Sequence, residues 1–339
     1  VALQGAKDTI TTGDGEAWVF GGEGDDSITD GEGDAVILGD LGKVMLVDGV
    51  IVRVEATNVE RGGDDVITTG GGDAWIVGGT GSDRIASGEG RGYILADTGL
   101  MTFNGLGRVT EITATDDGSY GDDTVTSGDG EDWIVGGAGA DVIDDGDGFA
   151  LILGDLGSVL ATGGVLTSVS SIVALQGAKD AITTGDGEAW VFGGEGDDSI
   201  TDGEGDAVIL GDLGTVTLAD GVIVRVEATE VLRGGDDVIT TGGGDAWIVG
   251  GTGSDEIASG EGRGYILADT GLMTFDAQGR VTKITATDDG SYGDDTITSG
   301  DGEDWIVGGA GADVITDGDG FALILGDLGK VLATGGVLT

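Results

Sequence analysis

The chain has 339 residues, with 64 acidic residues against 14 basic ones and a formal net charge of -50 at pH 7. A charge of this sign and size repels nucleic acid and anionic membrane surfaces, so cations are the expected partners. The sequence contains no Cys, no His and no apolar run near the ~18 residues of a membrane-spanning helix, which argues against a disulfide framework, a histidine zinc site and membrane insertion.

Two levels of repetition organise the chain. Residues 1–167 recur as residues 173–339, at an offset of 172 residues and with few differences. We therefore predict two long repeats, 1–172 and 173–339. Asp8, Asp65 and Asp123 begin equivalent segments 57 and 58 residues apart, which divides each long repeat into three related units. The predicted units lie at about 1–60, 61–118, 119–172, 173–232, 233–290 and 291–339.

Each unit begins with four apolar residues spaced nine positions apart, which in the first unit are Ile10, Val19, Ile28 and Ile37. Glycine-rich segments separate them, so we predict four three-residue strands whose central side chain points inward, with a chain reversal at each glycine loop. The first and third strands then stack in one sheet, and the second and fourth stack in an opposite sheet. The predicted fold class is all-β, built from parallel β-roll units.

The residues that flank each inward side chain differ between the two sheets. In the first unit they are Thr9, Thr11, Ser27 and Thr29 on one sheet, and Trp18, Phe20, Val36 and Leu38 on the other. A sheet that is apolar on both faces has to be covered. Residues 43–57, with their Asp48-Gly49 turn signal, predict a covering β-hairpin. The tryptophans at this position are expected to be packing anchors: Trp18, Trp75, Trp133, Trp190, Trp247 and Trp305.

The nine-residue motif GGxGxDxUx, in which U is a large apolar residue, is complete at residues 21–29, 78–86, 136–144, 193–201, 250–258 and 308–316. This pattern is typical of a calcium-binding parallel β-roll. Its aspartate supplies a carboxylate, and loop carbonyl groups complete the shell of about six to eight oxygen ligands that Ca²⁺ requires. The sequence therefore predicts several bound calcium ions.

Three aspartates of each unit fall on one edge of the predicted roll, where stacked loops would share ions. They are Asp8, Asp26, Asp40, Asp65, Asp83, Asp97, Asp123, Asp141, Asp155, Asp180, Asp198, Asp212, Asp237, Asp255, Asp269, Asp295, Asp313 and Asp327. On the other edge the equivalent positions hold small residues, with two exceptions: Ala17, Ala35, Ala74, Gly92 and Ala150, against Asp132 and Asp304. We expect few ions or none there, and we expect its acidic residues such as Glu32 and Glu89 to be solvated.

These motifs resemble the family of hemolysin-type, or RTX, calcium-binding repeats of secreted toxins, proteases, lipases, surface-layer proteins and adhesins. The resemblance covers about 36 of every 57 residues. It implies type I secretion in an unfolded state, an extracellular or cell-surface location, and folding in millimolar calcium. By position, it implies ion-binding loops that contain Gly22, Gly24, Gly79, Gly81, Gly137, Gly139, Gly194, Gly196, Gly251, Gly253, Gly309 and Gly311.

Three features depart from the family pattern. The loop at residues 3–7 lacks the glycine pair, and Asp40 replaces the second glycine of its loop, where it would add a carboxylate. The intervening hairpins are not part of the plain family roll. Because facing carboxylates repel until an ion separates them, we also expect metal binding and folding to be coupled, with affinities of roughly 10⁻⁴ to 10⁻³ M.

These observations favour a structural role, as the rod or scaffold of an adhesin, surface layer or filament, with calcium ions and copies of the chain as partners. A roll that binds ice or carbohydrate through its Thr-rich face is the alternative. We do not expect an enzyme, because His and Cys are absent and the acidic residues recur in six equivalent places. The alternative fold is a six-bladed β-propeller with one tryptophan per blade.

Overall fold

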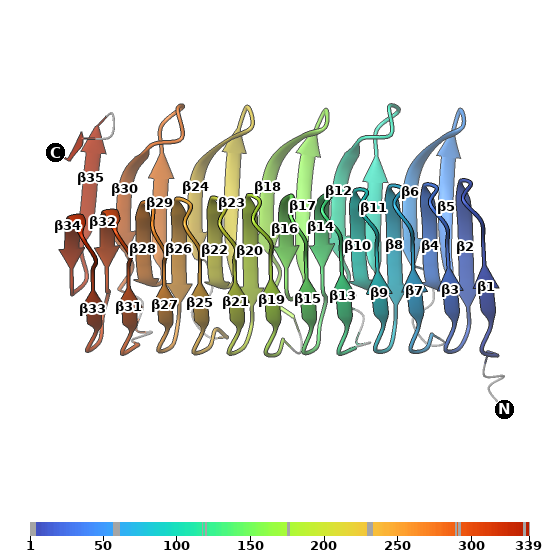
Figure 1. Cartoon of the computed structure of the whole chain (residues 1–339), viewed down its shortest axis with the longest axis horizontal. Coiled ribbons are helices and arrows are strands. Elements are labelled where there is room, and N and C mark those ends of the chain that lie inside the picture. Colours follow the sequence, from blue (N-terminus) through green and yellow to red (C-terminus); the bar gives the residue numbers. More distant parts are fainter. Residues whose placement is uncertain are drawn as a thin grey trace.

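The computed structural model describes residues 5–56, 62–116, 118, 121–174, 177–228, 233–288, 290, 293–334 and 337–338. Positions 3 and 4 of the first loop and position 57 at the end of the first predicted hairpin lie outside these ranges. Every regular element in the described residues is a β-strand, and the strands stack along one long axis (Figure 1). None of the described residues forms a helix long and apolar enough to cross a membrane.

The first sheet consists of short parallel strands, each centred on an inward apolar residue. In the described part of the chain it contains 12 strands: β1 (Thr9–Thr11), β3 (Ser27–Thr29), β7 (Val66–Thr68), β9 (Arg84–Ala86), β13 (Thr124–Thr126), β15 (Val142–Asp144), β19 (Ala181–Thr183), β21 (Ser199–Thr201), β25 (Val238–Thr240), β27 (Glu256–Ala258), β31 (Thr296–Thr298) and β33 (Val314–Thr316). These bounds agree with the predicted three-residue strands.

The second sheet is also parallel and lies opposite the first. Over the described ranges it contains 12 strands: β2 (Ala17–Gly22), β4 (Ala35–Asp40), β8 (Ala74–Gly79), β10 (Gly92–Asp97), β14 (Glu131–Val135), β16 (Phe149–Leu153), β20 (Ala189–Gly194), β22 (Ala207–Asp212), β26 (Ala246–Gly251), β28 (Gly264–Asp269), β32 (Gly302–Val307) and β34 (Gly320–Leu325). Its strands have five or six residues, so the predicted length of three was wrong here. They are longer because the parallel pairing continues into the loops, as between Ala17 and Ala35 and between Gly22 and Asp40.

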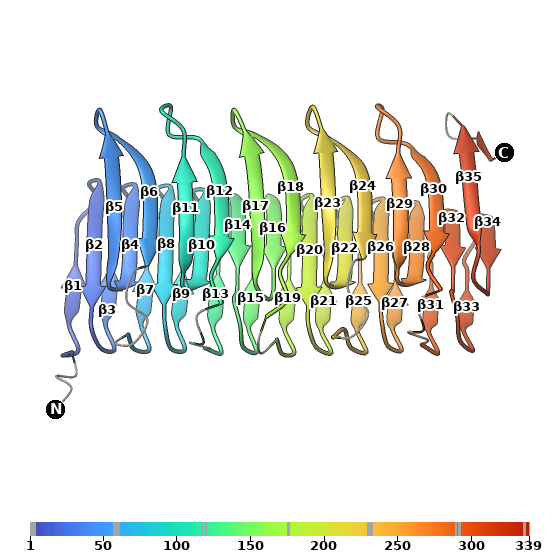
Figure 2. The same ribbon diagram turned by 180° about the vertical axis from the view of Figure 1, so that it is seen from behind.

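The hairpins form a third, antiparallel sheet over the second one (Figure 2). Among the described residues it contains 12 strands: β5 (Gly42–Val47), β6 (Val50–Ala56), β11 (Gly99–Phe103), β12 (Val109–Ala114), β17 (Gly157–Thr162), β18 (Val165–Ser171), β23 (Gly214–Ala219), β24 (Val222–Ala228), β29 (Gly271–Phe275), β30 (Val281–Ala286), β35 (Lys330–Thr334) and β36 (Val337–Leu338). The covering hairpin is therefore confirmed. Asp48 and Gly49 adopt φ of 52° and 83° at its turn, as an Asp-Gly hairpin turn requires.

Each hairpin also pairs with the hairpin of the next unit, which the sequence did not predict. Val54 of β6 lies opposite Met101 of β11, and Ile112 of β12 lies opposite Val159 of β17. Every unit thus contributes two strands to each of three sheets, and all three sheets share one long axis. The three open sheets along this axis exclude the propeller.

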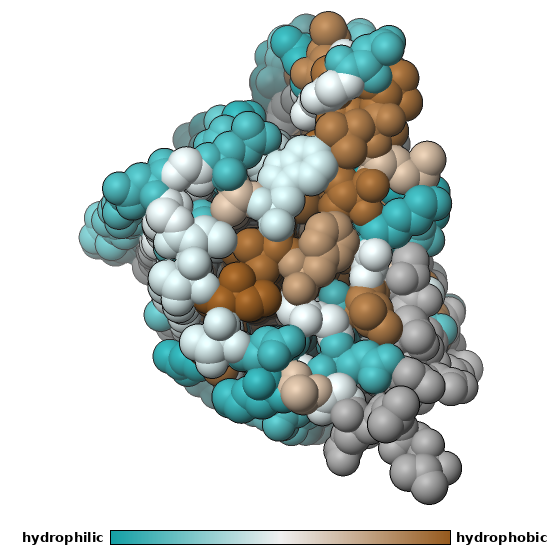
Figure 3. Space-filling model, turned by 90° about the vertical axis from the view of Figure 1, so that its right-hand side faces the viewer, coloured by the Kyte–Doolittle hydropathy of each residue, from teal (hydrophilic) through white to brown (hydrophobic). Residues whose placement is uncertain are grey.

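The inner core lies between the first and second sheets and consists of the residues with ninefold spacing. Ile28, Ile67 and Ile76 have no exposed surface. In the ladder, isoleucine stacks on isoleucine, as in the pairing of Ile28 with Ile67 across the first hairpin insertion. Burying each such side chain contributes about 1.5–3 kcal/mol. At the end of the stack that carries β1, apolar residues lie in the middle of the face and continue upward, with polar residues to the left and below (Figure 3).

The outer core lies between the second and third sheets. Leu38, Val77 and Leu95 of the second sheet pack into one cluster with Val54 and Met101 of the third. Five of the tryptophans belong to this cluster or pack against it, which agrees with their predicted role as anchors: Trp75, Trp133, Trp190, Trp247 and Trp305. Trp18 lies in the first unit and is 39% exposed.

Candidate metal sites on the aspartate edge

The loops that lead from the second sheet into the first form what we call the aspartate edge. The residue two positions before each strand's central residue in the first sheet is an aspartate. These aspartates stack in one row: Asp8, Asp26, Asp65, Asp83, Asp123, Asp141, Asp180, Asp198, Asp237, Asp255, Asp295 and Asp313. The parallel register of the first sheet fixes this stacking, because it places equivalent residues of successive coils side by side.

One repeated hydrogen bond connects the row. The backbone N–H of Asp8 donates to Asp26 Oδ1 at 2.7 Å, that of Asp26 to Asp65 Oδ1 at 2.6 Å, and that of Asp65 to Asp83 Oδ1 at 2.7 Å. The same bond recurs at every step to Asp313, where it measures 3.2 Å. The row therefore continues across the hairpin insertions without a gap, because each insertion leaves the roll and returns to it in register.

The other carboxylate oxygen of these aspartates is buried without a hydrogen-bond donor. This holds for Oδ2 of Asp26, Asp65, Asp83, Asp123, Asp141, Asp180, Asp198, Asp237, Asp255, Asp295 and Asp313. In the six complete motifs this oxygen lies over the first glycine of the loop. A Cβ added to Gly78 would lie 2.3 Å from Asp83 Oδ2 and 2.2 Å from the Ala96 carbonyl oxygen, so only glycine leaves room for the carboxylate. The motif requires glycine at its first position because no space is left there for a side chain.

A second set of buried aspartates lies against the second glycine of a neighbouring loop. Asp40 Oδ2 accepts hydrogen bonds from the N–H and the hydroxyl of Thr80, at 2.7 and 2.9 Å. A Cβ on Gly79, which has a φ of +130°, would lie 2.4 Å from the same oxygen. In two members of this set, Asp40 and Asp155, Oδ1 is buried without a donor. Asp212 lies equivalently and accepts from Thr252, whereas Asp327 is exposed.

Burial and mutual repulsion disfavour the charged form of these carboxylates. Burial is the larger cause and raises the pKa of Asp65 and Asp123 to about 7. Burial, then the charges of Asp212 and other neighbouring aspartates, raises the pKa of Asp237 to about 10. The pKa of Asp83 is raised well above its ordinary value in the same way. A divalent cation between the carboxylates would reverse this effect, because it stabilises their charged form.

The donor set on this edge fits calcium. It consists only of oxygen atoms, it carries a high negative charge, and its free carboxylate oxygens are buried next to glycine loops whose carbonyl groups are close by. Within the described residues, no three acidic side chains converge on a point by themselves. A bound ion would therefore take carboxylate oxygens from neighbouring coils together with backbone carbonyl oxygens. The sequence placed these aspartates correctly on one edge, and ion binding at each of them stays a prediction.

One loop that lacks the glycine pair carries a cation of the chain itself. Lys179, which precedes Asp180, donates from Nζ to the carbonyl oxygen of Asp197 at 2.7 Å. Next to it, Arg233 Nη1 contacts Glu195 at 3.3 Å and also donates to the carbonyl oxygen of Ala174. At this junction between the long repeats, ammonium and guanidinium groups supply positive charge to an otherwise acidic edge.

The opposite edge, formed by the loops that lead from the first sheet into the second, holds buried acidic residues that the sequence did not single out. They are Asp30, Asp145 and Asp202, each at most 6% exposed, in addition to Asp132 and Asp304. Asp202 Oδ1 accepts a hydrogen bond from Thr184 Oγ1 at 2.6 Å. Each of the three stands where the nonapeptide has its first glycine, and this substitution was the signal available in the sequence. Glu32 and Glu89 are exposed, as expected.

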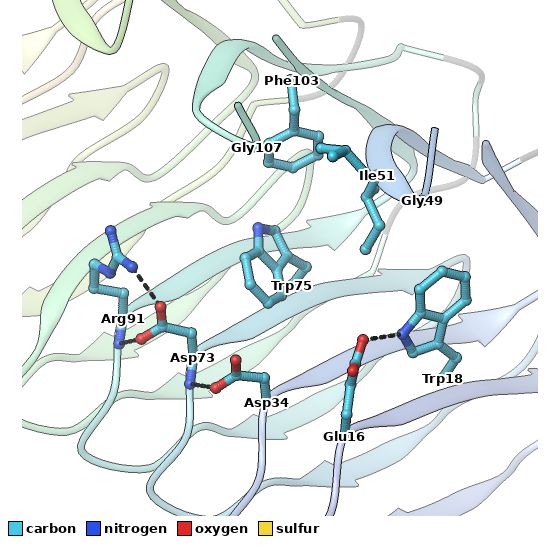
Figure 4. A pocket seen from close by; sticks show the side chains of 11 residues that line it. Glu16, Trp18, Asp34, Gly49, Ile51, Asp73, Trp75, Arg91, Phe103 and Gly107 are labelled. Carbon is cyan, nitrogen blue, oxygen red and sulfur yellow. Dashed lines mark hydrogen bonds and ion pairs between the residues drawn. The ribbon is translucent and has the colours of Figure 1, made fainter. Parts of the chain in front are cut away.

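The hairpin tips leave a groove of about 420 Å³ above the second sheet. Figure 4 shows Trp18, Trp75 and Phe103 on its walls and acidic side chains along its floor. Trp18 Nε1 donates to Glu16 at 3.2 Å, and Arg91 pairs with Asp73 at 2.5 Å. The ring of Trp75 packs edge-on against Phe103 at 6.4 Å. These polar and aromatic groups therefore satisfy one another, which agrees with a packing role.

Fold and site together define a calcium-binding β-roll, in which glycine loops stack aspartates along an edge. Comparison with protein families gives a match to the RTX calcium-binding nonapeptide repeat (4 copies) over residues 11–43, 61–94, 117–149, 183–218, 233–266 and 289–321. These segments cover more than half of the chain and coincide with the roll portion of all six units. The chain belongs to the RTX calcium-binding repeat family. Comparisons with curated proteins and with solved structures gave no significant match.

Proposed function

We propose that the chain is a calcium-dependent structural module of an extracellular protein, forming a rod-like segment of an adhesin, surface layer or filament. The observation that carries the proposal is the row of buried carboxylate oxygens without hydrogen-bond donors. Without a cation, a folded roll has to hold these groups either protonated or in mutual repulsion. Calcium relieves both costs, so binding of the metal and folding of the chain are coupled.

The proposal includes secretion before folding. Affinities of roughly 10⁻⁴ to 10⁻³ M, as in extracellular modules, would leave the chain without metal in the cytosol and loaded outside the cell. The formal net charge of -50 keeps the metal-free chain expanded. A chain that folds only outside the cell suits passage through a type I secretion channel.

The way the units stack supports the proposed rod role. Each unit buries the apolar edges of its neighbours in all three sheets, so stiffness extends along the whole axis (Figure 1). The acidic residues recur in equivalent positions and no His or Cys is present, which supports a structural role over a catalytic one. Copies of the chain could continue the same stacking in a filament or layer.

The test is a calcium titration of the purified chain, followed by circular dichroism and by sedimentation velocity. We expect a cooperative gain of β structure and a compact, elongated particle at millimolar calcium, and complete reversal by EGTA. A magnesium titration is the control, because Mg²⁺ demands a smaller octahedral shell. A β spectrum that persists through thorough chelation at neutral pH would contradict the proposal.

A ligand-binding role for the outer face of the first sheet is the second candidate. Thr9, Thr11 and Thr29 are exposed there, but Val142 is 48% exposed at an equivalent place and Arg84 interrupts another. An ice or glycan surface needs a regular array, so this face supports the candidate poorly. An ice-recrystallisation assay and a glycan array test it directly.

A further inference from the structure

Grooves lie beneath the hairpin tips, between the tips and the outer face of the second sheet. The groove at the first and second units has a volume of about 420 Å³, and Trp18, Trp75 and Phe103 lie on its walls (Figure 4). A groove of about 240 Å³ lies at the equivalent place in the second long repeat. It is lined by the equivalent rings: Trp190, Trp247 and Phe275. The groove is therefore a repeated feature of the fold.

A row of carboxylates lies along the floor of the groove. The register of the second sheet places Glu16, Asp34 and Asp73 on successive strands, about 4.8 Å apart. The Asp73 N–H donates to Asp34 Oδ1 at 3.1 Å, and Trp18 Nε1 donates to Glu16 Oε1 at 3.2 Å. Within the described residues no other group donates to Glu16 or Asp34. One oxygen of each of these two carboxylates is therefore left for a ligand.

An arginine of the chain itself shows how a cation lies in this row. Arg91 is next to Asp73 in the row, and its backbone N–H and Nη2 donate to Asp73 Oδ1 and Oδ2 at 3.1 and 2.5 Å. Its side chain lines the same groove as the ring of Trp75 (Figure 4). Arg263 and Asp245 repeat this ion pair at 2.8 Å in the second long repeat. Carboxylates and aromatic rings together stabilise a positive group at such a place.

The charge and the size of the grooves select the class of ligand. Three carboxylates against one arginine, in a chain of net charge -50, favour a positive ligand. Volumes of about 420 and 240 Å³ lie near or below the lower end of the ~300–1,000 Å³ of typical small-molecule sites, which favours a slender chain over linked sugar rings. Carboxylates one strand spacing apart suit amino groups that are joined by short alkyl spacers.

We propose that these grooves bind a linear aliphatic polyamine. Its ammonium groups pair with the carboxylates of Glu16 and Asp34, and with those of Glu188 and Asp206 in the second long repeat, while its alkyl chain lies against the tryptophan rings. Each of these carboxylates comes one residue before the aspartate position of the nonapeptide, which alanine occupies in these coils. The site is therefore separate from the aspartate edge. The proposal needs only the folded roll and does not depend on a rod role.

The test is isothermal titration calorimetry of spermidine with the full-length chain, in millimolar calcium and physiological salt. We expect two saturable sites, one for each long repeat. The variant Asp34→Asn/Asp206→Asn should weaken binding about fivefold, because each groove loses one exposed ion pair while the amide oxygen still accepts the neighbouring N–H. The matched control is Glu32→Gln/Glu204→Gln, which removes the same charge from exposed side chains outside the grooves and should leave the affinity unchanged.

Equal weakening by the two variants would overturn the proposal, because it would reduce binding to a diffuse attraction of cations. Binding of a neutral glucose oligosaccharide in place of spermidine would overturn it as well. A second measurement on the wild type stays decisive if the Asn variant does not fold. Bound spermidine should shift the tryptophan emission, and an unchanged emission at saturation would contradict a site beside these rings. A chain that folds in calcium but binds no spermidine refutes this inference alone, whereas a chain that folds without calcium refutes the proposed function.

Discussion

Without calcium, the fold should depend on pH in the direction opposite to that of most salt-bridged proteins. Burial is the largest cause that raises the pKa of five aspartates on the aspartate edge, from an ordinary value of 3.8 to about 7. They are Asp65, Asp123, Asp198, Asp212 and Asp295. A folded-state pKa above the unfolded one means that the folded chain binds protons more tightly. The resulting stability is fully present below about pH 4 and is lost as the pH rises through about 7.

The magnitude is large compared with the stability of a domain. A shift of about 3 pKa units corresponds to about 4 kcal/mol for each group. Three such groups would change the free energy of unfolding by about 12 kcal/mol, which is comparable to the ~5–15 kcal/mol that stabilises a typical domain. We therefore expect the EGTA-treated chain to be folded near pH 4.5 and unfolded at pH 8. Calcium should restore the fold at pH 8, because it binds the deprotonated carboxylates.

The assay is tryptophan fluorescence and circular dichroism across this pH range, in EGTA and in millimolar calcium, with sedimentation velocity to exclude aggregation near the isoelectric point. Asp65→Asn should move the metal-free transition to higher pH, because it removes one of the groups that must ionise. A metal-free chain that is more folded at pH 8 than at pH 4.5 would refute the reasoning.

Asp65→Asn and two further substitutions, Ile76→Ala and Gly78→Ala, test single parts of the structure. In a calcium titration, Asp65→Asn should raise the calcium concentration at the folding midpoint about tenfold, while it stabilises the metal-free chain at pH 7. The control Asp64→Asn, at an exposed neighbour, should change this midpoint little. Equal effects of the two substitutions would contradict a metal site at Asp65. In urea denaturation with calcium present, Ile76→Ala should lower the free energy of unfolding by about 2–5 kcal/mol. The control Val66→Ala, at a side chain that is 40% exposed, should lower it by less than about 0.5 kcal/mol. Gly78→Ala should lower the free energy of unfolding by about 1–3 kcal/mol and weaken calcium binding, because its Cβ would overlap Asp83 Oδ2. The control is Gly15→Ala, whose Cβ meets no atom within 4 Å. A Gly78→Ala chain with unchanged stability would argue against the space requirement.

The sequence by itself determined the roll, its covering hairpins and the edge on which the aspartates gather. Ile28 and Ile37 lie nine residues apart, and a three-residue strand followed by a glycine loop returns the chain to the opposite sheet after that distance. Strand geometry is local, so it can be inferred from the spacing of apolar residues and the places where glycine is required. The stacking of Asp26 on Asp65 follows from the same regularity.

Only the tertiary structure decided how the hairpins join and how the opposite edge is arranged. In the roll, each unit adds two strands to each sheet and so advances by two strand spacings along the long axis. A hairpin also has two strands at the same spacing. Successive hairpins therefore come within hydrogen-bonding distance, and Val54 pairs with Met101. Asp145 could be noticed in the sequence as an aspartate at a glycine position. Its contact with Asp132 depends on the depth to which both side chains are buried between coils, and burial of that kind is a property of the whole stack.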